Sequence, residues 1–315
     1  MAGTSVAFLG PPGSFGEEAL LSEPDLAAAD LVWLPSMTDI LAEVEAGNVD
    51  LGFVAIENSI EGTVNSVIDA LVFDCHVLVQ REVLFEVTQN LLGPAGTDHA
   101  EIRRVVSFPN ALGQCRRWIS THLPRAEELA ATSTSEAARM VSAGGLGPGV
   151  SAALGSGLAA RRHGLEVLVP HVEDHPGNTT RFVVVAAPGP GAIPRPTGHD
   201  KTSVVCFQKA DEPGSLHAIL GLFKAFDINL TKLESRPAKT GLGDYCFIVD
   251  FEGHIADEVV ADCLRVLHAE QAGVKFLGSY PALADHGEHL RRQADAAWKE
   301  AEAWMAGLRA QIRKA

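Results

Sequence analysis

Residues 174–186, DHPGNTTRFVVVA, join a polar turn rich in Pro, Gly and Asn to an apolar, β-branched run. The run is typical of a buried strand, and the turn places the hydroxyl of Thr180 and the guanidinium of Arg181 where that strand begins. Loops held by strands often carry side chains that donate a hydrogen bond to a reacting group. An ordinary loop with a capping Thr and a surface Arg has the same pattern. The other motifs of the chain therefore have to decide between the two interpretations.

The region before this stretch alternates short apolar runs with helical patterns. Strand-like runs at 6–9, 31–34, 50–56, 105–108, 149–154 and 165–169 are separated by helices, one of them opened by a capping pattern at Ser133 and Glu136. This alternation predicts an α/β fold around a mostly parallel sheet for residues 5–186. A Pro- and Gly-rich segment follows at 187–196, which predicts an extended linker and a domain boundary.

A second, smaller unit is predicted beyond the linker. Strands at 202–207, 228–235, 245–251 and 274–279 and helices at 216–226 and 255–268 follow in the order βαββαβ, a ferredoxin-like arrangement, with Gly241 and Gly243 in the turn between the middle strands. From residue 287 onward, apolar residues at helical spacing predict an amphipathic helix. The predicted boundaries are 1–187 for the first domain, 188–200 for the linker, 201–281 for the second domain and 282–315 for the tail.

Composition restricts the class of protein. A chain of 315 residues with 46% hydrophobic and 21% charged residues is long enough for two domains with cores of their own. Its net charge of −15 disfavours nucleic-acid binding. Five widely spaced cysteines with no CxxC pair indicate a reducing compartment without a disulfide framework or structural zinc, and Cys115 is interpreted as a packed core thiol. Without a signal peptide or a run of ~20 apolar residues, we expect a cytoplasmic protein that does not bind membranes.

Two segments of the first domain are candidate ligand sites. GPPGSFG at 10–16 lies between a strand and a helix, where free backbone N–H groups form an anion site; its spacing matches neither GxGxxG nor a P-loop. The strand at 50–56 delivers Glu57, Asn58 and Ser59 at its carboxyl end, the usual position of a ligand crevice in α/β sheets. Glu57 taken alone is equally consistent with a solvated loop carboxylate.

Several of these motifs, taken in order, resemble those of the prephenate dehydratase family. GPPGSF at 10–15, IENSIEG at 56–62, FPNALGQC at 108–115 and NTTRF at 178–182 resemble four signatures of that family. PGSL at 213–216, NLTKLESRP at 229–237, GH at 253–254 and LGSYP at 277–281 are similar to its C-terminal ACT domain. Ala55, Phe108 and Asn110 depart from the usual Pro, His and Gln. The resemblance covers residues 5 to about 281 and shows no chorismate mutase domain before the first strand.

The resemblance implies a two-lobed, periplasmic-binding-protein-like catalytic domain joined to a βαββαβ ACT domain. The implied reaction converts prephenate to phenylpyruvate with loss of CO₂ and water, and aromatisation of the ring drives it without a cofactor or metal. By resemblance Thr180 donates to the leaving hydroxyl, Glu57 is a candidate proton relay, and Gln114 is the third residue at the reaction centre. The residues implied in substrate binding are Ser14, Asn58, Ser59, Asn178, Arg181 and Phe182.

The resemblance also implies feedback regulation by L-phenylalanine at a site where two ACT domains meet, and hence a homodimer or homotetramer. The residues assigned to that site are Gly214, Ser215, Leu216, Asn229, Leu230, Glu234 and Ser235. Three alternatives remain open: a dehydratase that prefers the amino analogue arogenate, a prephenate decarboxylase that keeps the hydroxyl, and a non-catalytic amino-acid sensor. The intact sequence Thr180-Arg181-Phe182 favours a dehydratase over a decarboxylase.

Overall fold

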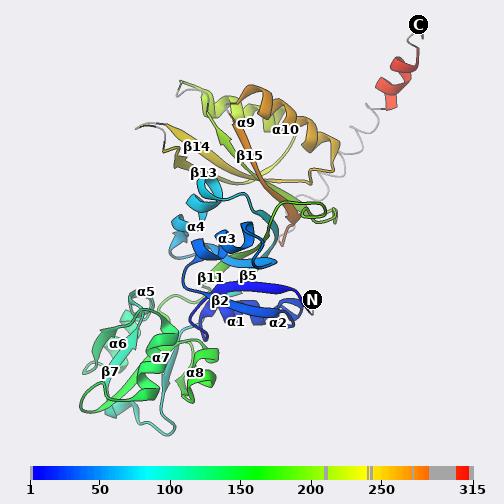
Figure 1. Ribbon diagram of the computed structural model, residues 1–315. Helices are drawn as coiled ribbons and strands as arrows, with labels where there is room; N and C mark the ends of the chain where they lie inside the picture. Colours follow the sequence, from blue (N-terminus) through cyan, green and yellow to red (C-terminus); the bar gives the residue numbers. More distant parts are fainter. Residues whose placement is uncertain are drawn as a thin grey trace. The chain divides into compact units, whose positions relative to one another are not determined.

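The computed structural model describes residues 3–208, 212–239, 241, 244–271, 273–283 and 303–311 (Figure 1). Its contacts divide the chain into two compact units. The first unit is Met1–Cys75 with Val83–Ala187, and the second is His76–Glu82 with Pro188–Ala315. The first unit consists of two lobes, each built on its own sheet. Among the described residues, no helix is long and apolar enough to cross a membrane.

The first lobe is a sheet with strand order β2-β1-β3-β11-β5. Its strands are β1 (Ser5–Leu9), β2 (Asp30–Leu34), β3 (Leu51–Asn58), β5 (Leu78–Glu86) and β11 (Thr179–Ala186), with the short β4 (Gly62–Thr63) beside β3. Its helices are α1 (Phe15–Leu21), α2 (Pro24–Ala27), α3 (Met37–Glu45) and α4 (Asn65–Asp69), the last running into a π-helical turn, Ala70–Asp74. Apolar side chains of β1, β3 and β11 pack against α1 and α2 and form the core of the lobe.

The second lobe is a five-stranded sheet with strand order β10-β6-β9-β7-β8. Its strands are β6 (Asn90–Gly93), β7 (Ile102–Ser107), β8 (Glu127–Ala130), β9 (Val150–Gly155) and β10 (Glu166–Val169), and a 3₁₀ turn, His99–Glu101, precedes β7. Its helices are α5 (Pro109–Gln114), α6 (Arg116–His122), α7 (Thr134–Ala143) and α8 (Gly157–His163). Ser133 caps α7 as expected, since its Oγ accepts the Glu136 N–H at 3.0 Å, but the Glu136 carboxylate pairs with Arg139.

Both sheets are mixed, where the sequence predicted a mostly parallel arrangement. In the first lobe β1 pairs in parallel with β2 and β3, whereas β11 runs antiparallel to β3. In the second lobe β7 is parallel to β8 and β9, whereas β6 is antiparallel to β9 and to β10. The reason is the path of the chain: it leaves the first lobe along β5 and returns along β11. The whole second lobe is therefore an insertion between two strands of the first sheet.

The second unit has the predicted βαββαβ order. Its elements are β12 (Asp200–Phe207), α9 (Ser215–Ala225), β13 (Leu230–Pro237), β14 (Tyr245–Glu252), α10 (Glu258–Glu270) and β15 (Gly273–Pro281). The antiparallel sheet has the order β13-β14-β12-β15, and its apolar face packs on α9 and α10. Helix α10 begins later than predicted because residues 254–257 form a turn, in which Asp257 accepts the His254 N–H at 2.7 Å. Gly243 lies outside the described residues; of the predicted tail helix, residues 303–310 are described and helical, and 284–302 and 312–315 lie outside.

Strand β5 contributes to both units. Its beginning belongs to the second unit, and Val83 is the first residue of the returning part of the first unit. Within the second unit, the buried Glu82 carboxylate pairs with Lys201 at 2.9 Å. Asp250 lies 3.9 Å from Lys201 and accepts a hydrogen bond from Ser203 at 2.7 Å. The first residues of β5 thus belong to the buried charge cluster of the second unit.

Candidate active site

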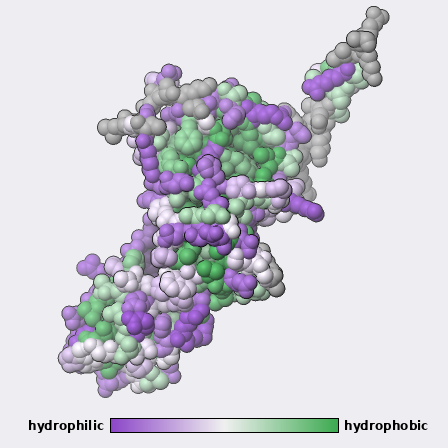
Figure 2. Space-filling model, viewed as in Figure 1, coloured by the Kyte–Doolittle hydropathy of each residue, from purple (hydrophilic) through white to green (hydrophobic). Residues whose placement is uncertain are grey.

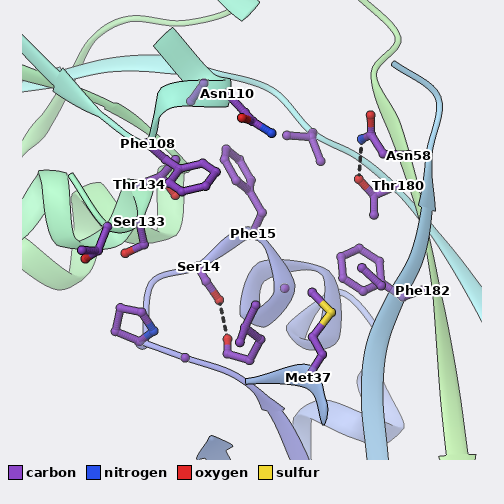
Figure 3. Close-up of a pocket in the computed structure, with 18 of the residues that line it drawn as sticks. Ser14, Phe15, Met37, Asn58, Phe108, Asn110, Ser133, Thr134, Thr180 and Phe182 are labelled. Atoms are coloured by element: carbon purple, nitrogen blue, oxygen red, sulfur yellow. Dashed lines mark hydrogen bonds between the residues drawn. The ribbon is translucent and has the colours of Figure 1, made fainter. Parts of the chain in front are cut away.

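A pocket of about 670 Å³ opens in the first unit, between its two lobes. Figure 3 shows Ser14, Phe15 and Met37 on one side, Phe108, Ser133 and Thr134 across from them, and Asn58, Thr180 and Phe182 along the wall. The other polar residues of the lining are Gln89, Asn110, Gln114, Thr132 and Asn178. In the part of the chain that the structure describes, the lining contains no Asp, Glu, His, Lys, Arg or Cys. This pocket can therefore offer a ligand hydroxyls, amides, backbone groups and apolar walls, but no side-chain charge.

The alternation of strand β11 decides which residues of the NTTRF motif face the pocket. Thr180 and Phe182 line it, whereas Arg181 points to the other face of the sheet, as successive strand residues do. On that face Arg181 Nη2 lies 2.9 Å from Glu57 Oε2, and the two residues are cross-strand partners between β11 and β3. Ser59 Oγ accepts the Thr179 N–H at 2.9 Å. The structure therefore does not bring Glu57, Ser59 or Arg181 into the lining.

Thr180 is oriented by the side chain of Asn58. The Asn58 oxygen accepts the N–H groups of Ile60 at 2.9 Å and Glu61 at 3.0 Å, which fixes the amide so that its NH₂ points away from them. That NH₂ donates to Thr180 Oγ1 at 2.9 Å and to Asn178 Oδ1 at 2.7 Å. Among the described residues Thr180 has no acceptor for its own hydrogen. Because Thr180 lines the pocket, its hydroxyl is free to donate there.

The amide network continues from Asn178 into the second lobe. Asn178 Nδ2 donates to Gln114 Oε1 at 3.2 Å, and Gln114 Nε2 donates to the Glu61 carboxylate at 3.2 Å. Gln89 Nε2 makes a longer contact, 3.5 Å, to the same Gln114 oxygen. Gln114 thus lines the pocket but has partners at both ends of its amide. Its contacts fit a residue that holds Asn178 and Gln89 in place.

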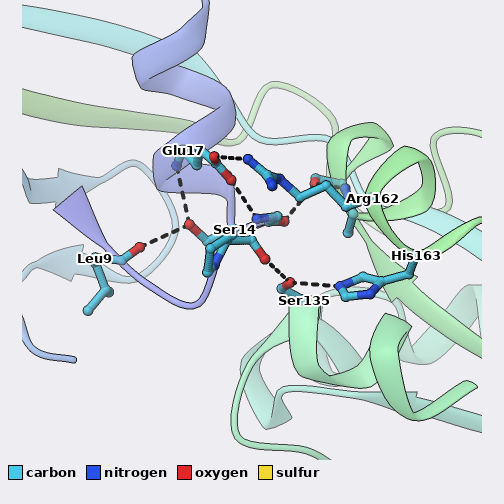
Figure 4. A network of polar contacts seen from close by, with 10 residues as sticks. Leu9, Ser14, Glu17, Ser135, Arg162 and His163 are labelled. Carbon is cyan, nitrogen blue, oxygen red and sulfur yellow. Dashed lines mark hydrogen bonds and ion pairs between the residues drawn. The ribbon is translucent and has the colours of Figure 1, made fainter. Parts of the chain in front are cut away.

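The Gly-rich loop differs from the expected anion site (Figure 4). The N–H of Gly13 donates to Glu17 Oε2 at 2.6 Å, so a carboxylate of the chain itself occupies the place expected for a ligand anion. Ser14 Oγ caps α1 by accepting the Glu17 N–H at 3.2 Å, and it donates to the Leu9 carbonyl at 3.1 Å. Glu17 is buried and pairs with Arg162 of α8. The prediction of an anion site at this loop is corrected because α1 turns its first carboxylate, that of Glu17, back onto the loop.

Further contacts hold the loop to the second lobe. Ser156 Oγ donates to the Gly13 carbonyl at 3.1 Å, and Ser135 donates to the Pro12 carbonyl. His163 Nε2 lies 3.4 Å from Ser135 Oγ, and burial together with nearby arginines lowers the pKa of His163. Helix α7 presents its N-terminus to the pocket through Thr132, Ser133 and Thr134. Unlike Gly13, this end of a ten-residue helix adjoins the pocket directly, and its dipole favours anions.

Cys115 is confirmed as a core thiol. It is fully buried, and burial, followed by the nearby Asp174 and Glu173 carboxylates, raises its pKa to about 12. All five cysteines are buried and form no disulfide. Among the described residues, no group of three or more His, Cys, Asp or Glu side chains is placed to hold a metal ion.

Sequence reasoning missed Gln89 and the N-terminus of α7 as parts of the pocket. A signal for Gln89 was present, because Gln89 and Asn90 directly precede Leu91 and Leu92 at the end of a β-like run of mixed polar and apolar residues between residues 77 and 92. Polar residues beside a buried apolar pair need partners, and such residues are candidates for a site. The Ser133 cap was recognised, but its position at the pocket depends on the packing of the two lobes.

Comparison with known proteins identifies the family of this chain. The family model for prephenate dehydratase matches residues 6–190, and the model for the ACT domain matches residues 202–269. The chain belongs to the prephenate dehydratase family. A prephenate dehydratase from Mycolicibacterium vanbaalenii is 41% identical over 317 residues, covering 96% of this chain and 98% of the relative.

Two solved structures have similar folds; one contains a bound ligand, and the other is described by a different activity. The crystal structure of the Arthrobacter aurescens prephenate dehydratase in complex with L-phenylalanine is 37% identical, has a TM-score of 0.86, and covers 97% of this chain and 99% of its own. A protein described as a quorum-quenching acylase is 29% identical, has a TM-score of 0.78, and covers 88% and 98%.

The residues assigned to the effector site gather at two places in the second unit. Gly214, with φ of 93°, caps α9, and Ser215 and Leu216 form its first turn. Asn229 Nδ2 donates to Glu252 Oε1 at 3.2 Å just before β13, which Leu230 begins. Further along β13, Glu234 lies 3.3 Å from Lys232 and 3.8 Å from Arg236. The remaining residue, Ser235, pairs with Phe247 of β14.

Proposed function

We propose that this protein catalyses the decarboxylating dehydration of prephenate to phenylpyruvate and is regulated by phenylalanine. The observation that carries the proposal is the Thr180 hydroxyl, oriented by Asn58 to donate into a pocket without side-chain charge. The bond from the ring to its carboxylate breaks, its electron pair enters the ring, and CO₂ leaves. The ring C–O bond breaks at the same time, and the hydroxyl leaves as water after taking one proton, which comes from solvent. Because the ring becomes aromatic, an oriented donor suffices and no strong acid or base is required.

The first group of residues in this proposal lines the pocket. Thr180 donates to the departing hydroxyl, and Phe182 forms the wall beside the ring. Asn58, Gln114 and Asn178 hold Thr180 in place. Phe182 is itself fixed, since it stacks on Phe53 with ring centroids 4.7 Å apart.

Glu57, Ser59 and Arg181 act from outside the lining. Their contacts bind β3 to β11 and to the Thr179 backbone beside Thr180, so we assign them a supporting role. The carboxylates of prephenate then need donors other than Arg181. The N-terminus of α7 at Thr132–Thr134 lines the pocket and supplies them, whereas the hydroxyl hydrogen of Ser14 is already bonded to the Leu9 carbonyl.

The direct experiment incubates the purified protein with prephenate and follows the absorbance of phenylpyruvate. Appearance of phenylpyruvate supports the proposal. A product that keeps the ring hydroxyl would make the protein a decarboxylase, and turnover of arogenate alone would make it an arogenate dehydratase. Binding of amino acids without any turnover would leave the sensor alternative.

An acylase activity, which the acylase neighbour raises, is less well supported. Acyl transfer to a side-chain nucleophile needs a base within hydrogen-bond reach of that nucleophile. Hydroxyls line the pocket, but the lining supplies no His, Asp, Glu or Lys to activate them. The same lining fits a fragmentation that needs only hydrogen-bond donors.

The regulatory part of the proposal rests on the second unit. The Arthrobacter relative binds L-phenylalanine, and the same βαββαβ unit is present here. We propose that phenylalanine binds near Gly214–Leu216 and Asn229–Leu230 at an interface between two copies, giving a homodimer or homotetramer. Strand β13 is an edge of its sheet and exposes Leu233, and Figure 2 shows hydrophobic residues interspersed with polar ones on the visible surface of this unit. Five cysteines that form no disulfide favour a cytoplasmic location.

A further inference from the structure

Gln89 lies in the segment between β5 and β6, where the chain passes from the first lobe to the second, and it lines the pocket. Its side chain is 3% exposed. Among the described residues, its Oε1 has no hydrogen-bond partner. An unpaired buried acceptor is unfavourable, and such groups in native structures call for an explanation. Its place in the pocket wall suggests that a ligand supplies the missing donor.

The direction of the Gln89 amide follows from its neighbours. The Glu61 carboxylate only accepts hydrogen bonds, so Gln114 turns its NH₂ toward Glu61 and its oxygen toward Asn178 and Gln89. Two oxygens in contact would repel each other, so Gln89 faces Gln114 with its own NH₂. The Gln89 oxygen is therefore the end of the amide that is left for a ligand.

The same reasoning fixes the opposite end of the network. Two backbone N–H groups donate to the Asn58 oxygen, and the Asn58 NH₂ donates to Thr180 Oγ1. The hydroxyl hydrogen of Thr180 is therefore free to donate into the pocket. The pocket is thus lined at one end of a single amide network by Thr180, whose hydrogen is free to donate, and at the other end by Gln89, whose buried Oε1 has no partner among the described residues. A donor and an acceptor together are complementary to a hydroxyl group.

We propose that Gln89 contacts the substrate and accepts a hydrogen bond from its ring hydroxyl, an inference that rests on the proposed dehydratase function. The prephenate dianion has two carboxylates and a keto group, all acceptors, and its ring hydroxyl is its one hydrogen-bond donor. An acceptor that binds prephenate directly must therefore bind that hydroxyl. Gln89 then holds the O–H while Thr180 donates to the oxygen lone pair, so the leaving group is held in one orientation.

This contact strengthens during the reaction. As the C–O bond lengthens and a proton moves onto the oxygen, the remaining O–H becomes a better donor, and its bond to Gln89 becomes stronger. Interactions that are stronger in the transition state raise kcat. The terminal torsion of Gln is soft, so a small rotation brings Oε1 from its buried position to the ligand. The departing water keeps its original hydrogen, and no proton passes to Gln89.

The test compares the wild type with Gln89→Met, which keeps the length of the side chain and removes its polar atoms. With prephenate, kcat/KM falls about tenfold, mostly through kcat, as expected for the loss of one hydrogen bond made in the transition state. The dissociation constant of phenylpyruvate, which has no ring hydroxyl, stays within about twofold of the wild type. A role in the shape of the pocket alone would weaken phenylpyruvate binding as well.

Asn90→Leu is the matched control. Asn90 is also buried, but its amide donates to the carbonyls of Gly155 at 3.2 Å and Thr88 at 3.4 Å, and it does not line the pocket. Asn90→Leu therefore lowers Tm and leaves kcat near the wild-type value. Gln89→Met has the opposite pattern: Tm is unchanged or higher, because an unpaired buried oxygen has been removed, while kcat falls.

Three results would overturn the inference: unchanged kcat/KM in Gln89→Met, an equal loss of phenylpyruvate affinity, or a loss confined to arogenate. The last result would show that Oε1 binds an amino group instead of the ring hydroxyl. If the wild type fails to convert prephenate in the same assay, the proposed function itself fails. An active wild type with an unaffected Gln89→Met variant refutes only the role of Gln89.

Discussion

Thr180 is the residue on which the proposed chemistry depends most. Its Oγ1 accepts from Asn58 at 2.9 Å, which leaves its hydrogen as the donor for the pocket. An orientation fixed before the substrate arrives is more effective than a mobile hydroxyl, because no reorganisation is needed during the reaction.

Thr180→Val should therefore lower kcat by about 10²-fold or more, since one preorganised donor is removed, whereas KM should change less. Steady-state kinetics with prephenate test this expectation. Thr179→Val is the matched control, because Thr179 Oγ1 bonds the Gly177 carbonyl at 3.3 Å, has no other partner among the described residues, and lies outside the pocket lining. Near-normal kcat in Thr180→Val would remove Thr180 from the mechanism.

The cysteines give a residue-scale prediction about pH. Burial raises the pKa of the thiols of Cys115, Cys206 and Cys263 to about 12, from an ordinary value of 9.0. The unfolded thiols lose their protons first, so this contribution to stability is intact below about pH 9 and is lost as pH rises toward 12. The thiolate is the reactive form. At pH 8 a thiol reagent should modify none of the three in the native protein and all three in urea; rapid native labelling would contradict their burial.

At the scale of elements, α1 and α8 are joined across the two lobes. Glu17 of α1 pairs with Arg162, and Glu18 accepts the Leu158 N–H at 3.0 Å and lies 3.9 Å from Arg161. In the Glu17–Arg162 ion pair the carboxylate is buried, with 3% of the Glu17 side chain exposed. In the Glu18–Arg161 pair the arginine is in solvent, with 71% of its side chain exposed. The two neighbouring arginines of α8 thus provide a buried and an exposed version of the same contact.

Arg162→Met should lower the free energy of unfolding by at least about 2 kcal/mol, because the buried Glu17 carboxylate loses its counter-charge. The partial exposure of Arg162 keeps this value below that of a fully buried pair. Arg161→Met, the matched control, should change it by less than about 0.5 kcal/mol. Urea unfolding measures both variants. Adding Glu17→Gln to Arg162→Met should restore much of the loss. Equal effects of the two single arginine variants would show that the Glu17 pair has no special role.

Elements also show where prediction from sequence was incomplete. Helix α3 begins at a local signal, because Ser36 caps it: its Oγ accepts the Asp39 N–H at 3.0 Å. Strand β8 was not predicted, since Glu127–Ala130 is mostly exposed and lacks an apolar pattern. It is a strand because it pairs in parallel with β7, a contact that no local pattern reveals.

At the scale of the whole molecule, the two units share strand β5, and phenylalanine bound to the second unit must act on a reaction in the first. The binding site is proposed at an interface between copies, so binding and assembly are linked. We expect at least a dimer, and expect phenylalanine to favour one oligomeric form.

Gly214→Ala should abolish inhibition by phenylalanine and retain catalysis. Gly214 has φ of 93°, which disfavours a side chain, and an added Cβ meets no atom of the described chain within 4 Å, so it enters the space proposed for the ligand. Gly221→Ala is the control, since it lies on the same helix, with an ordinary φ and open space around its Cβ. Calorimetry and inhibition assays with phenylalanine measure both variants. If the wild type shows neither heat of binding nor inhibition at millimolar phenylalanine, the ACT domain has a structural role only.

The sequence by itself determined the two-domain organisation, the βαββαβ order and the motifs that lie near the pocket. These depend on local periodicity, turn residues and short spacings, which the chain carries wherever it folds. It also placed Asn58 and Thr180 among the site residues, although 122 positions separate them. Their hydrogen bond, and the amide network that continues to Gln89, could not be derived from spacing.

Only the tertiary structure decided which polar groups the pocket receives. Alternation along β11 separates Arg181 from its neighbours Thr180 and Phe182, but packing of the lobes determines which face borders the cavity. Likewise, the N–H of Gly13 is occupied because α1 turns Glu17 toward it. A hydrogen bond depends on distances of about 3 Å between groups that packing brings together. Sequence patterns specify which groups are available, and the fold decides which of them remain unpaired for a substrate.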